Sequence, residues 1–222
     1  MTNGPTWNEY LSAFMGTDLF NHAYSGATAN NTILPRAVPD VSEQIQEFHT
    51  SCTSFDDQET LYIIWTGVND VHDIYVATSN ITEQNILLDN IIESIANEMK
   101  RLPHEHLLVL GLAPIQHLPL FTQHLGTSDA LSSLIDTFND KLRALAQGVI
   151  RFIDTRRLFE KYFTLQDTDG FADITQACIR DFKQCLSSKF NYIWWDDWHP
   201  STATHQLLAA DLYDILHNTN LT

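Results

Sequence analysis

The chain has 222 residues, of which 44% are hydrophobic and 11% aromatic, enough to fill the core of a globular domain. This composition excludes collagen-like, coiled-coil and wholly disordered proteins. Twelve basic residues against 28 acidic ones give a net charge of −16, which repels nucleic-acid phosphates and anionic membranes. We therefore expect no nucleic-acid partner, and no membrane span either, because no apolar run reaches about 18 residues.

Apolar residues alternate between helical and strand spacing along the chain. The predicted elements are a helix over 5–15, a strand over 19–24, a helix over 39–49, a strand over 60–65, a helix over 82–101 with a capped start at 82–85, a strand over 106–112, a helix over 128–147 closed by Gly148, a strand over 149–153, and helices over 157–163 and 200–217. Strand and helix alternate four times, which favours one α/β domain with a parallel sheet and helices on both faces.

Cysteines and glycosylation sequons bear on the cellular location. Cys178 and Cys185 are seven residues apart, a spacing that suits a small disulfide loop, whereas Cys52 is expected to be a buried free thiol or half of a bridge whose partner is absent. Three acceptor sequons begin at Asn30, Asn80 and Asn220. Together these features favour an extracellular, secreted protein, although the first 15 residues lack the layout of a signal peptide.

The strongest candidate for chemistry directly precedes the last predicted helix, in the segment Trp195-Asp196-Asp197-Trp198-His199-Pro200. Pro200 opens the helix, so His199 is expected at a loop–helix junction. Asp196 stands three residues earlier and is placed to accept a hydrogen bond from the imidazole, as a catalytic base and its orienting partner require. The alternative is a capping aspartate beside a surface histidine. Of the nine other histidines, none pairs at metal spacing with a clear third ligand, so we expect no metal and no other cofactor.

Two further candidates follow predicted strands, where parallel α/β sheets carry their ligands. Gly67 allows a sharp turn after the strand over 60–65, and Asn69 would then present its side-chain amide as a donor to an oxyanion. Gly26 follows the strand over 19–24 and offers a backbone N–H where a side chain would block the substrate. For both segments the alternative is an ordinary turn.

Four blocks, in this order along the chain, resemble the GDSL or SGNH hydrolase family. They are Asn3-Gly4-Pro5-Thr6-Trp7-Asn8-Glu9-Tyr10-Leu11, Ala23-Tyr24-Ser25-Gly26-Ala27-Thr28-Ala29, Gly67-Val68-Asn69-Asp70 and Trp195-Asp196-Asp197-Trp198-His199-Pro200. The resemblance covers essentially the whole chain. It is strongest to fungal secreted esterases, including acetylesterases of carbohydrate esterase family sixteen. Phospholipase-like and thermolabile-haemolysin-like members share the same blocks.

The resemblance implies a three-layer α/β/α flavodoxin-like sandwich and ester hydrolysis through an acyl-enzyme. It implies that His199 is the general base, Asp196 its orienting partner, and Gly26 and Asn69 the oxyanion donors. The expected substrate is a small-molecule, carbohydrate or lipid ester. The tryptophans near the last block would stack a sugar or pack an acyl chain, but core packing is the preferred interpretation. We expect a monomer.

One departure concerns the nucleophile. The family's first block, Gly-Asp-Ser, normally precedes the Asn-Gly-Pro-x-Trp stretch by some tens of residues, and no Gly-Asp-Ser occurs in this chain. We therefore interpret residues 1–222 as a single hydrolase domain that lacks its nucleophile block and its first strand, through truncation, and expect it to be inactive as written. Ser25 is an unfavoured substitute, because Ala23-Tyr24-Ser25-Gly26-Ala27 lacks the first glycine of a nucleophile elbow.

Two alternatives to a truncated esterase remain. One is a pseudoenzyme that binds an acylated carbohydrate or lipid without turning it over. The other is an unstable fragment without a function of its own, because removal of a central strand exposes sheet edges.

Overall fold

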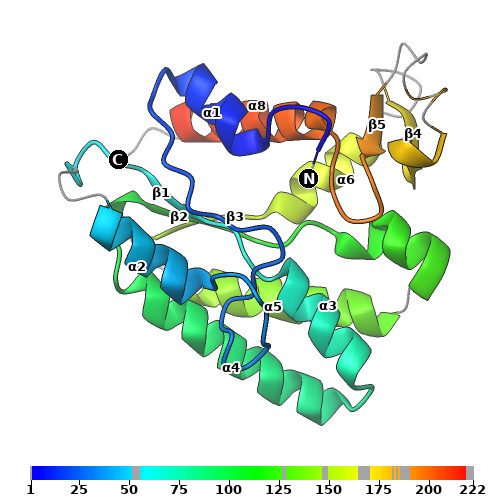
Figure 1. Ribbon diagram of the computed structural model, residues 1–222, viewed down its shortest axis with the longest axis horizontal. Coiled ribbons are helices and arrows are strands. Elements are labelled where there is room, and N and C mark those ends of the chain that lie inside the picture. The colour runs from blue at the N-terminus through cyan, green and yellow to red at the C-terminus, as the bar shows by residue number, and fades with distance from the viewer. Residues whose placement is uncertain are drawn as a thin grey trace. The chain divides into compact units, whose positions relative to one another are not determined.

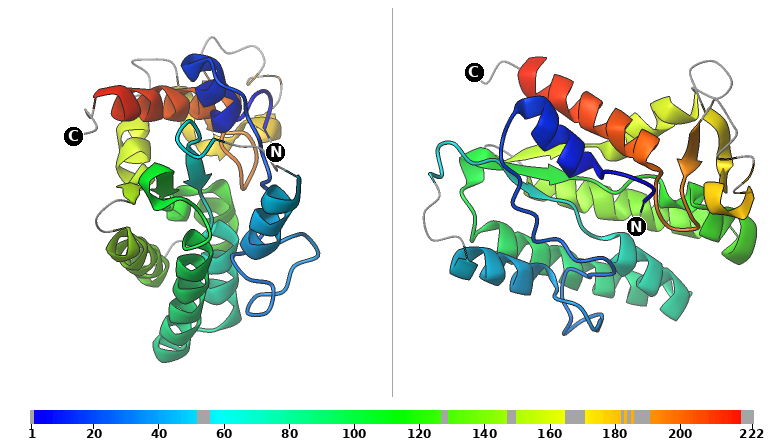
Figure 2. Two further views of the ribbon diagram at one scale, coloured as in Figure 1. Left: turned by 90° about the vertical axis from the view of Figure 1, so that its left-hand side faces the viewer. Right: turned by 45° about the horizontal axis from the view of Figure 1, so that its top comes forward.

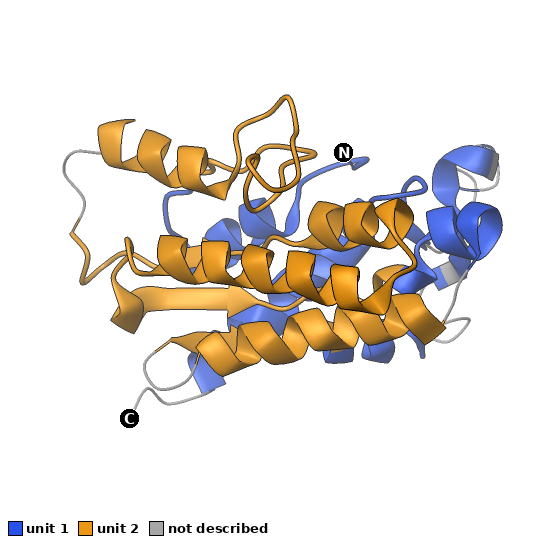
Figure 3. Ribbon diagram, turned by 90° about the horizontal axis from the view of Figure 1, so that it is seen from below, with its two compact units in different colours: residues 1–20, 116–127, 157–222 blue, residues 21–115, 128–156 orange. Residues whose placement is uncertain are grey.

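A computed structural model of the protein describes residues 2–51, 56–126, 129–146, 150–164, 171–181, 183, 185 and 191–218. Helices alternate with strands along these residues, and the paired strands run parallel (Figure 1). This pattern confirms the predicted α/β class and is consistent with the α/β/α fold of SGNH hydrolases. The chain forms two compact units, coloured separately in Figure 3: unit 1 is Met1–Phe20, Gln116–Thr127 and Arg157–Thr222, and unit 2 is Asn21–Ile115 and Ser128–Arg156.

Unit 2 is built on a parallel sheet of short strands, β1 (Tyr62–Ile64), β2 (Leu107–Leu110) and β3 (Arg151–Ile153), in the order β1-β2-β3. The register places Ile63 beside Leu108 and Val109 beside Phe152. Every residue of β2 is buried, as expected for the central strand of a covered parallel sheet. The strands predicted over 60–65 and 106–112, and the described part of the one over 149–153, are confirmed with shorter bounds.

The helices of unit 2 are α2 (Val41–Ser51), α3 (Val68–Ala77), α4 (Ile81–Met99) and α5 (Asp129–Leu145). Helices α3, α4 and α5 pack on one another and lie on the same side of the sheet in Figures 1 and 2. Leu88, Ile91 and Ile95 form the buried stripe of α4, which follows from their helical spacing. The helices predicted over 39–49, 82–101 and 128–147 are confirmed, while Gly148 lies outside the described residues.

Unit 1 contains α1 (Trp7–Met15), most of α6 (Thr155–Phe163), α8 (Thr202–Asn218) and the parallel strands β4 (Phe171–Ala177) and β5 (Asn191–Trp194). The predicted helices over 5–15, 157–163 and 200–217 correspond to α1, α6 and α8. Thr6 and Glu9 form a capping box that begins α1, and Gly16 ends it in the left-handed conformation. The shorter turns of the structure are η1 (His104–His106), η2 (Ile115–His117), the π-helical η3 (Leu120–Leu125) and η4 (Cys178–Asp181).

The strand predicted over 19–24 does not form. These residues belong to neither sheet, and Leu19, Phe20 and Tyr24 are exposed. The segment has the apolar content of a strand, but a strand also needs a neighbour to satisfy its backbone groups. The turn predicted to follow it at Gly26 is present, closed by the N–H of Ala27 on the carbonyl of Tyr24 at 3.3 Å.

Three other local features differ from the sequence-based expectations. Gly67 makes the predicted turn after β1 with a φ of +114°, but it also caps α3, a helix that the sequence did not predict and that Val71 and Ile74 anchor in the core. Helix α4 is capped by Asn80 rather than within 82–85. Strands β4 and β5 were not predicted, because the polar residues of 171–177 interrupt any apolar period. No helix among the described residues is both long and apolar enough to cross a membrane.

Candidate active site

The loop between β5 and α8 carries the predicted base. Trp194 and Pro200 form an antiparallel bridge at the base of this loop, and the N–H of Trp195 donates to the carbonyl of His199 at 2.8 Å. The loop is therefore closed at its neck by backbone hydrogen bonding. Such closure fixes where the side chains of Asp196 and His199 leave the main chain.

The structure brings Asp196 and His199 together as predicted. The Asp196 Oδ1 atom lies 2.8 Å from His199 Nδ1, and Oδ2 lies 2.9 Å from the same nitrogen. The carboxylate also accepts the backbone N–H groups of Trp198 and His199, each at 2.8 Å. Asp196 thus closes its own loop and orients the imidazole with the same oxygen atoms.

This contact assigns the tautomer of His199. A carboxylate only accepts hydrogen bonds, so Nδ1 carries a hydrogen, and in the neutral ring Nε2 keeps its lone pair. Burial alone would raise the pKa of the Asp196 carboxyl, but the hydrogen bonds from the His199 ring and from the Trp198 N–H outweigh it, and the pKa is lowered from its ordinary value. Asp196 therefore stays ionised where it faces the ring, as an orienting partner must.

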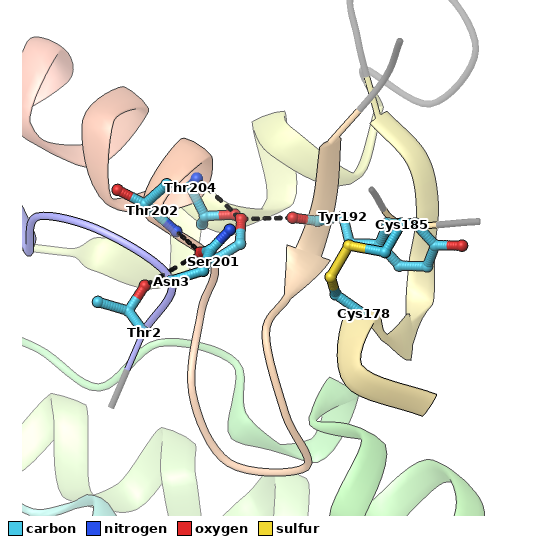
Figure 4. The surroundings of a disulfide bond; sticks show 8 residues. All are labelled: Thr2, Asn3, Cys178, Cys185, Tyr192, Ser201, Thr202 and Thr204. Atoms are coloured by element: carbon cyan, nitrogen blue, oxygen red, sulfur yellow. Dashed lines mark hydrogen bonds between the residues drawn. A yellow bond between two sulfur atoms is a disulfide. The ribbon is translucent and has the colours of Figure 1, made fainter. Parts of the chain in front are cut away.

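The start of α8, directly after the loop, is held by the amino-terminal residues (Figure 4). Asn3 Oδ1 accepts the N–H of Thr202 at 2.9 Å, and Thr202 Oγ1 donates to the carbonyl of Pro5 at 2.9 Å. A Cβ on Gly4 would lie 2.7 Å from Thr202 Oγ1, so a larger residue there would displace the Thr202 side chain. These contacts give the Asn3-Gly4-Pro5 block a structural role: it fixes the helix that follows His199.

A disulfide lies beside the same loop. Cys178 and Cys185, whose pairing the sequence left open, are bonded (Figure 4), and Arg180 stands between them in the chain. The guanidinium of Arg180 donates to the carboxylate of Asp197 at 2.8 to 3.0 Å, and the N–H of Ile179 donates to the carbonyl of Trp195 at 3.1 Å. The disulfide segment is thus tied to both the side chains and the backbone of the loop.

Removing this disulfide is expected to destabilise the protein moderately. A closed segment of this length restricts the unfolded chain, and its loss costs about 2 kcal/mol. The double variant Cys178→Ser and Cys185→Ser should therefore unfold at lower urea than the wild type. A reductant should lower the wild-type midpoint toward that of the variant and leave the variant unchanged; a variant as stable as the oxidised wild type would show that the bridge contributes nothing.

The predicted oxyanion donors come together in unit 2. Gly26 stands in the turn with a φ of +85°, a conformation that suits glycine. Asn69 lies in the first turn of α3 and donates from Nδ2 to the carbonyl of Ala27, the next residue in that turn, at 2.8 Å. This contact positions the Asn69 side chain beside the turn that contains Gly26. A primary amide has two N–H donors, and the contact with Ala27 uses one of these two.

Asp70 makes a second connection between the same two segments. Its carboxylate accepts the N–H of Ala29 at 3.0 and 3.3 Å, and its side chain is fully buried. Burial raises the pKa of Asp70 to about 6, against the effect of the Ala29 hydrogen bond. The adjacent residues Asn69 and Asp70 therefore both hold the 26–29 segment, one by donating and the other by accepting.

The predicted site residues are thus found as two pairs. Asp196 and His199 belong to unit 1, Gly26 and Asn69 to unit 2, and each pair is formed within its own unit. Ser25 is exposed in the turn of unit 2. Of the tryptophans near the loop, Trp194 is buried and stacks on Phe159 with ring centroids 6.0 Å apart, so the preferred interpretation of core packing is confirmed for it.

Sequence reasoning did not assign Asn3, Asp70 or Arg180 a role. Asn3 and Asp70 stand within the resembling blocks, and their position there was the available signal. Arg180 stands between the two close cysteines, but its pairing with Asp197 depends on the fold and leaves no local pattern.

Comparison with known proteins identifies the family. Residues 1–212 match the GDSL-like lipase/acylhydrolase family. The chain is 26% identical over 239 aligned residues to an acetylesterase of Thermothelomyces thermophilus, across 96% of this chain and 75% of the relative. It is 23% identical over 246 aligned residues to a thermolabile hemolysin of Vibrio parahaemolyticus, across 98% of this chain and 56% of the relative, so it spans only about half of that protein. The chain belongs to the family of GDSL-like lipases and acylhydrolases, and the predicted class, a carboxylic ester hydrolase by resemblance, is confirmed.

Proposed function

We propose that the protein acts in ester hydrolysis, with His199 as general base, Asp196 as its orienting partner, and Gly26 and Asn69 as oxyanion donors. One observation carries this proposal: the 2.8 Å contact between Asp196 Oδ1 and His199 Nδ1. It leaves Nε2 as the acceptor for the proton of a serine hydroxyl. Capping requires only the backbone N–H groups of Trp198 and His199, so the ring contact is the additional feature that supports a catalytic role.

The proposed reaction follows from these groups. His199 Nε2 takes the proton as the serine oxygen bonds to the acyl carbon, and the ionised Asp196 stabilises the imidazolium. The negative charge on the carbonyl oxygen is met by the Gly26 N–H and by the second N–H of Asn69, the one not donated to Ala27. His199 then passes its proton to the departing alcohol. Water repeats the sequence on the acyl-enzyme and releases the acid.

We place the nucleophile in a Gly-Asp-Ser segment that this sequence does not contain, and regard residues 1–222 as a single domain completed by that segment. Two structural features support this view. Among the described residues, β1 is the terminal strand of the sheet of unit 2, and the segment 19–24 joins no sheet. A strand with the missing block at its carboxyl end would add a neighbour where the sheet now ends.

For the substrate we favour an acetylated carbohydrate. The acetylesterase relative supports the acetyl group, since the chain covers more of it than of the hemolysin. The carbohydrate rests on the resemblance of the sequence blocks to carbohydrate esterase family sixteen. A lipid ester is the second candidate, through the resemblance of the same blocks to phospholipase-like members. The disulfide between Cys178 and Cys185 and the sequons at Asn30 and Asn80 support a secreted protein that acts outside the cell. That the protein acts as a monomer is part of the proposal.

The chain of 222 residues is expected to hydrolyse p-nitrophenyl acetate no faster than its His199→Ala variant, because it has a base but no activated serine. The measurement compares the two proteins with the uncatalysed rate at equal concentration. Turnover by the wild type that disappears in Ser25→Ala, and survives replacement of the other serines, would make Ser25 the nucleophile and contradict the proposal.

The genomic sequence upstream of Met1 separates the alternatives. An in-frame Gly-Asp-Ser there, and turnover by the longer protein, support the esterase. A longer protein with that block that binds an acetylated oligosaccharide without cleaving it would instead indicate the pseudoenzyme.

A further inference from the structure

Two glycosylation sequons lie in the described part of the chain, one at Asn30 and one at Asn80. Both have the sequence Asn-x-Thr that oligosaccharyl transfer requires, with the sugar attached to the amide nitrogen Nδ2. Sequence alone does not rank them. Their surroundings in the folded protein differ in exposure, in the partners of Nδ2, and in the space around it.

Asn80 leaves its amide nitrogen available. The residue is exposed and caps α4, with its Oδ1 accepting the N–H of Thr82 at 3.0 Å and that of Glu83 at 3.4 Å. Capping uses only the oxygen, and among the described residues nothing accepts a hydrogen bond from Nδ2. A sugar on Nδ2 would therefore leave the cap intact and extend into solvent.

Asn30 has both ends of its side chain engaged. Nδ2 donates to Ser94 Oγ at 3.0 Å, and Oδ1 accepts the N–H and the hydroxyl of Thr32 at 2.8 and 2.6 Å. The residue is partly buried and borders an open depression whose other walls include Glu93 and Glu98 of α4. A sugar on this nitrogen would have to be accommodated against α4, at the expense of the hydrogen bond to Ser94.

The surface around Asn80 gives a second, independent indication. Val76 at the end of α3, Ile81 and Ile86 at the start of α4 are 59%, 70% and 56% exposed. Asn80 lies between Val76 and Ile81 in the chain, in the short connection between the two helices. A bulky polar sugar on Asn80 would add polar surface next to these exposed aliphatic side chains along the chain.

We propose that Asn80 is the N-glycosylation site of the described part of the protein, and that Asn30 remains unmodified. In the transfer, a bond forms between Asn80 Nδ2 and the first sugar carbon of a lipid-linked oligosaccharide pyrophosphate. The bond from that carbon to the pyrophosphate oxygen breaks, Nδ2 loses one proton, and the lipid pyrophosphate leaves. The inference rests on the proposed secretion and is independent of the proposed ester hydrolysis.

The test is secretion of the chain from yeast behind a heterologous leader, followed by peptide mass spectrometry before and after enzymatic removal of N-glycans. Thr82→Ala is the informative variant, because it destroys the sequon and keeps Asn80 as the cap. Asn80 accepts backbone N–H groups of residues 82 and 83, and the side chain of residue 82 takes no part in these hydrogen bonds. Alanine also favours a helix more than threonine does, so the fold is retained. Thr82→Ser preserves the sequon and is the matched control, and Thr32→Ala removes the sequon of Asn30.

We expect protein from the medium to carry a sugar on Asn80 in the wild type, in Thr82→Ser and in Thr32→Ala, and to lose it in Thr82→Ala. The peptide containing Asn30 should be found unmodified throughout. Secreted protein without sugar on Asn80, or with sugar on Asn30 in most molecules, would overturn the inference. Neither outcome depends on esterase activity, so failure here would not be confused with failure of the proposed reaction.

Discussion

Gly67→Ala is expected to lower the free energy of unfolding by about 4 kcal/mol, from two costs that add. Gly67 has a φ of +114°, where an L-residue with a side chain is strained by about 1 to 2 kcal/mol. A Cβ at this position would also lie 2.3 Å from Cζ of Phe138, a fully buried ring of α5. Forcing an atom into a packed core costs about 1 to 3 kcal/mol more. Urea unfolding followed by circular dichroism measures the sum.

Gly16→Ala is the matched control for that change. Gly16 also has a positive φ, +66°, but no atom lies within 4 Å of the Cβ it would gain, so only the backbone cost of about 1 to 2 kcal/mol applies. Phe138→Leu should recover part of the loss when combined with Gly67→Ala, although it destabilises the wild type. Equal losses for the two glycine variants, or no recovery in the double variant, would show that Phe138 does not confine Gly67.

In a form of the protein that carries a Gly-Asp-Ser segment, His199→Ala is expected to lower kcat by about 10⁴-fold or more, because the serine then lacks a base. Asp196→Asn should lower kcat to a similar order, about 10⁴-fold, because an amide nitrogen facing Nδ1 favours the wrong ring tautomer. Steady-state hydrolysis of p-nitrophenyl acetate measures both.

His217→Ala serves as the control for replacing a histidine. His217 lies on the exposed end of α8, where its ring stacks on Tyr213, and its loss should leave kcat unchanged. If His199→Ala retained a near-normal rate while the wild type depended on its Gly-Asp-Ser serine, His199 would have no part in the reaction.

The sequence predicts best those helices and strands whose type is determined by the spacing of apolar residues within the segment itself. The run over 60–65 and the stripe of 82–101 fix a strand and a helix through their own spacing. The segment 19–24 has equally suitable residues and forms no strand, because pairing depends on a neighbour that spacing cannot supply. Residues 67–70 are the opposite case. Gly67 and Asn69 are residue types common in turns, but the burial of Val71 and Ile74 in the core makes this segment the start of α3.

The candidate site divides in the same way. The separation of three residues between Asp196 and His199 allows their contact within one short loop, so the pattern alone predicts it. The contact of Asn69 with Ala27 joins residues 42 positions apart, and that of Arg180 with Asp197 joins residues 17 apart. Only the fold determines these distances, so the sequence gives the residue types but not the partners.

The hydrogen bonds that Asn3 and Pro5 make with Thr202 have a practical consequence for how the protein is prepared. A purification tag joined before Thr2 would be attached one residue from Asn3, whose side chain accepts the N–H of Thr202 at the start of α8. Thr202 is in turn only three residues after His199. A tag joined at the other end lies beyond Asn218, and the 17 residues of α8 separate that point from Thr202 by about 25 Å. A carboxyl-terminal tag therefore leaves the contacts of Asn3 and Pro5 with Thr202 unchanged, whereas a tag joined directly before Thr2 risks displacing the helix that follows His199.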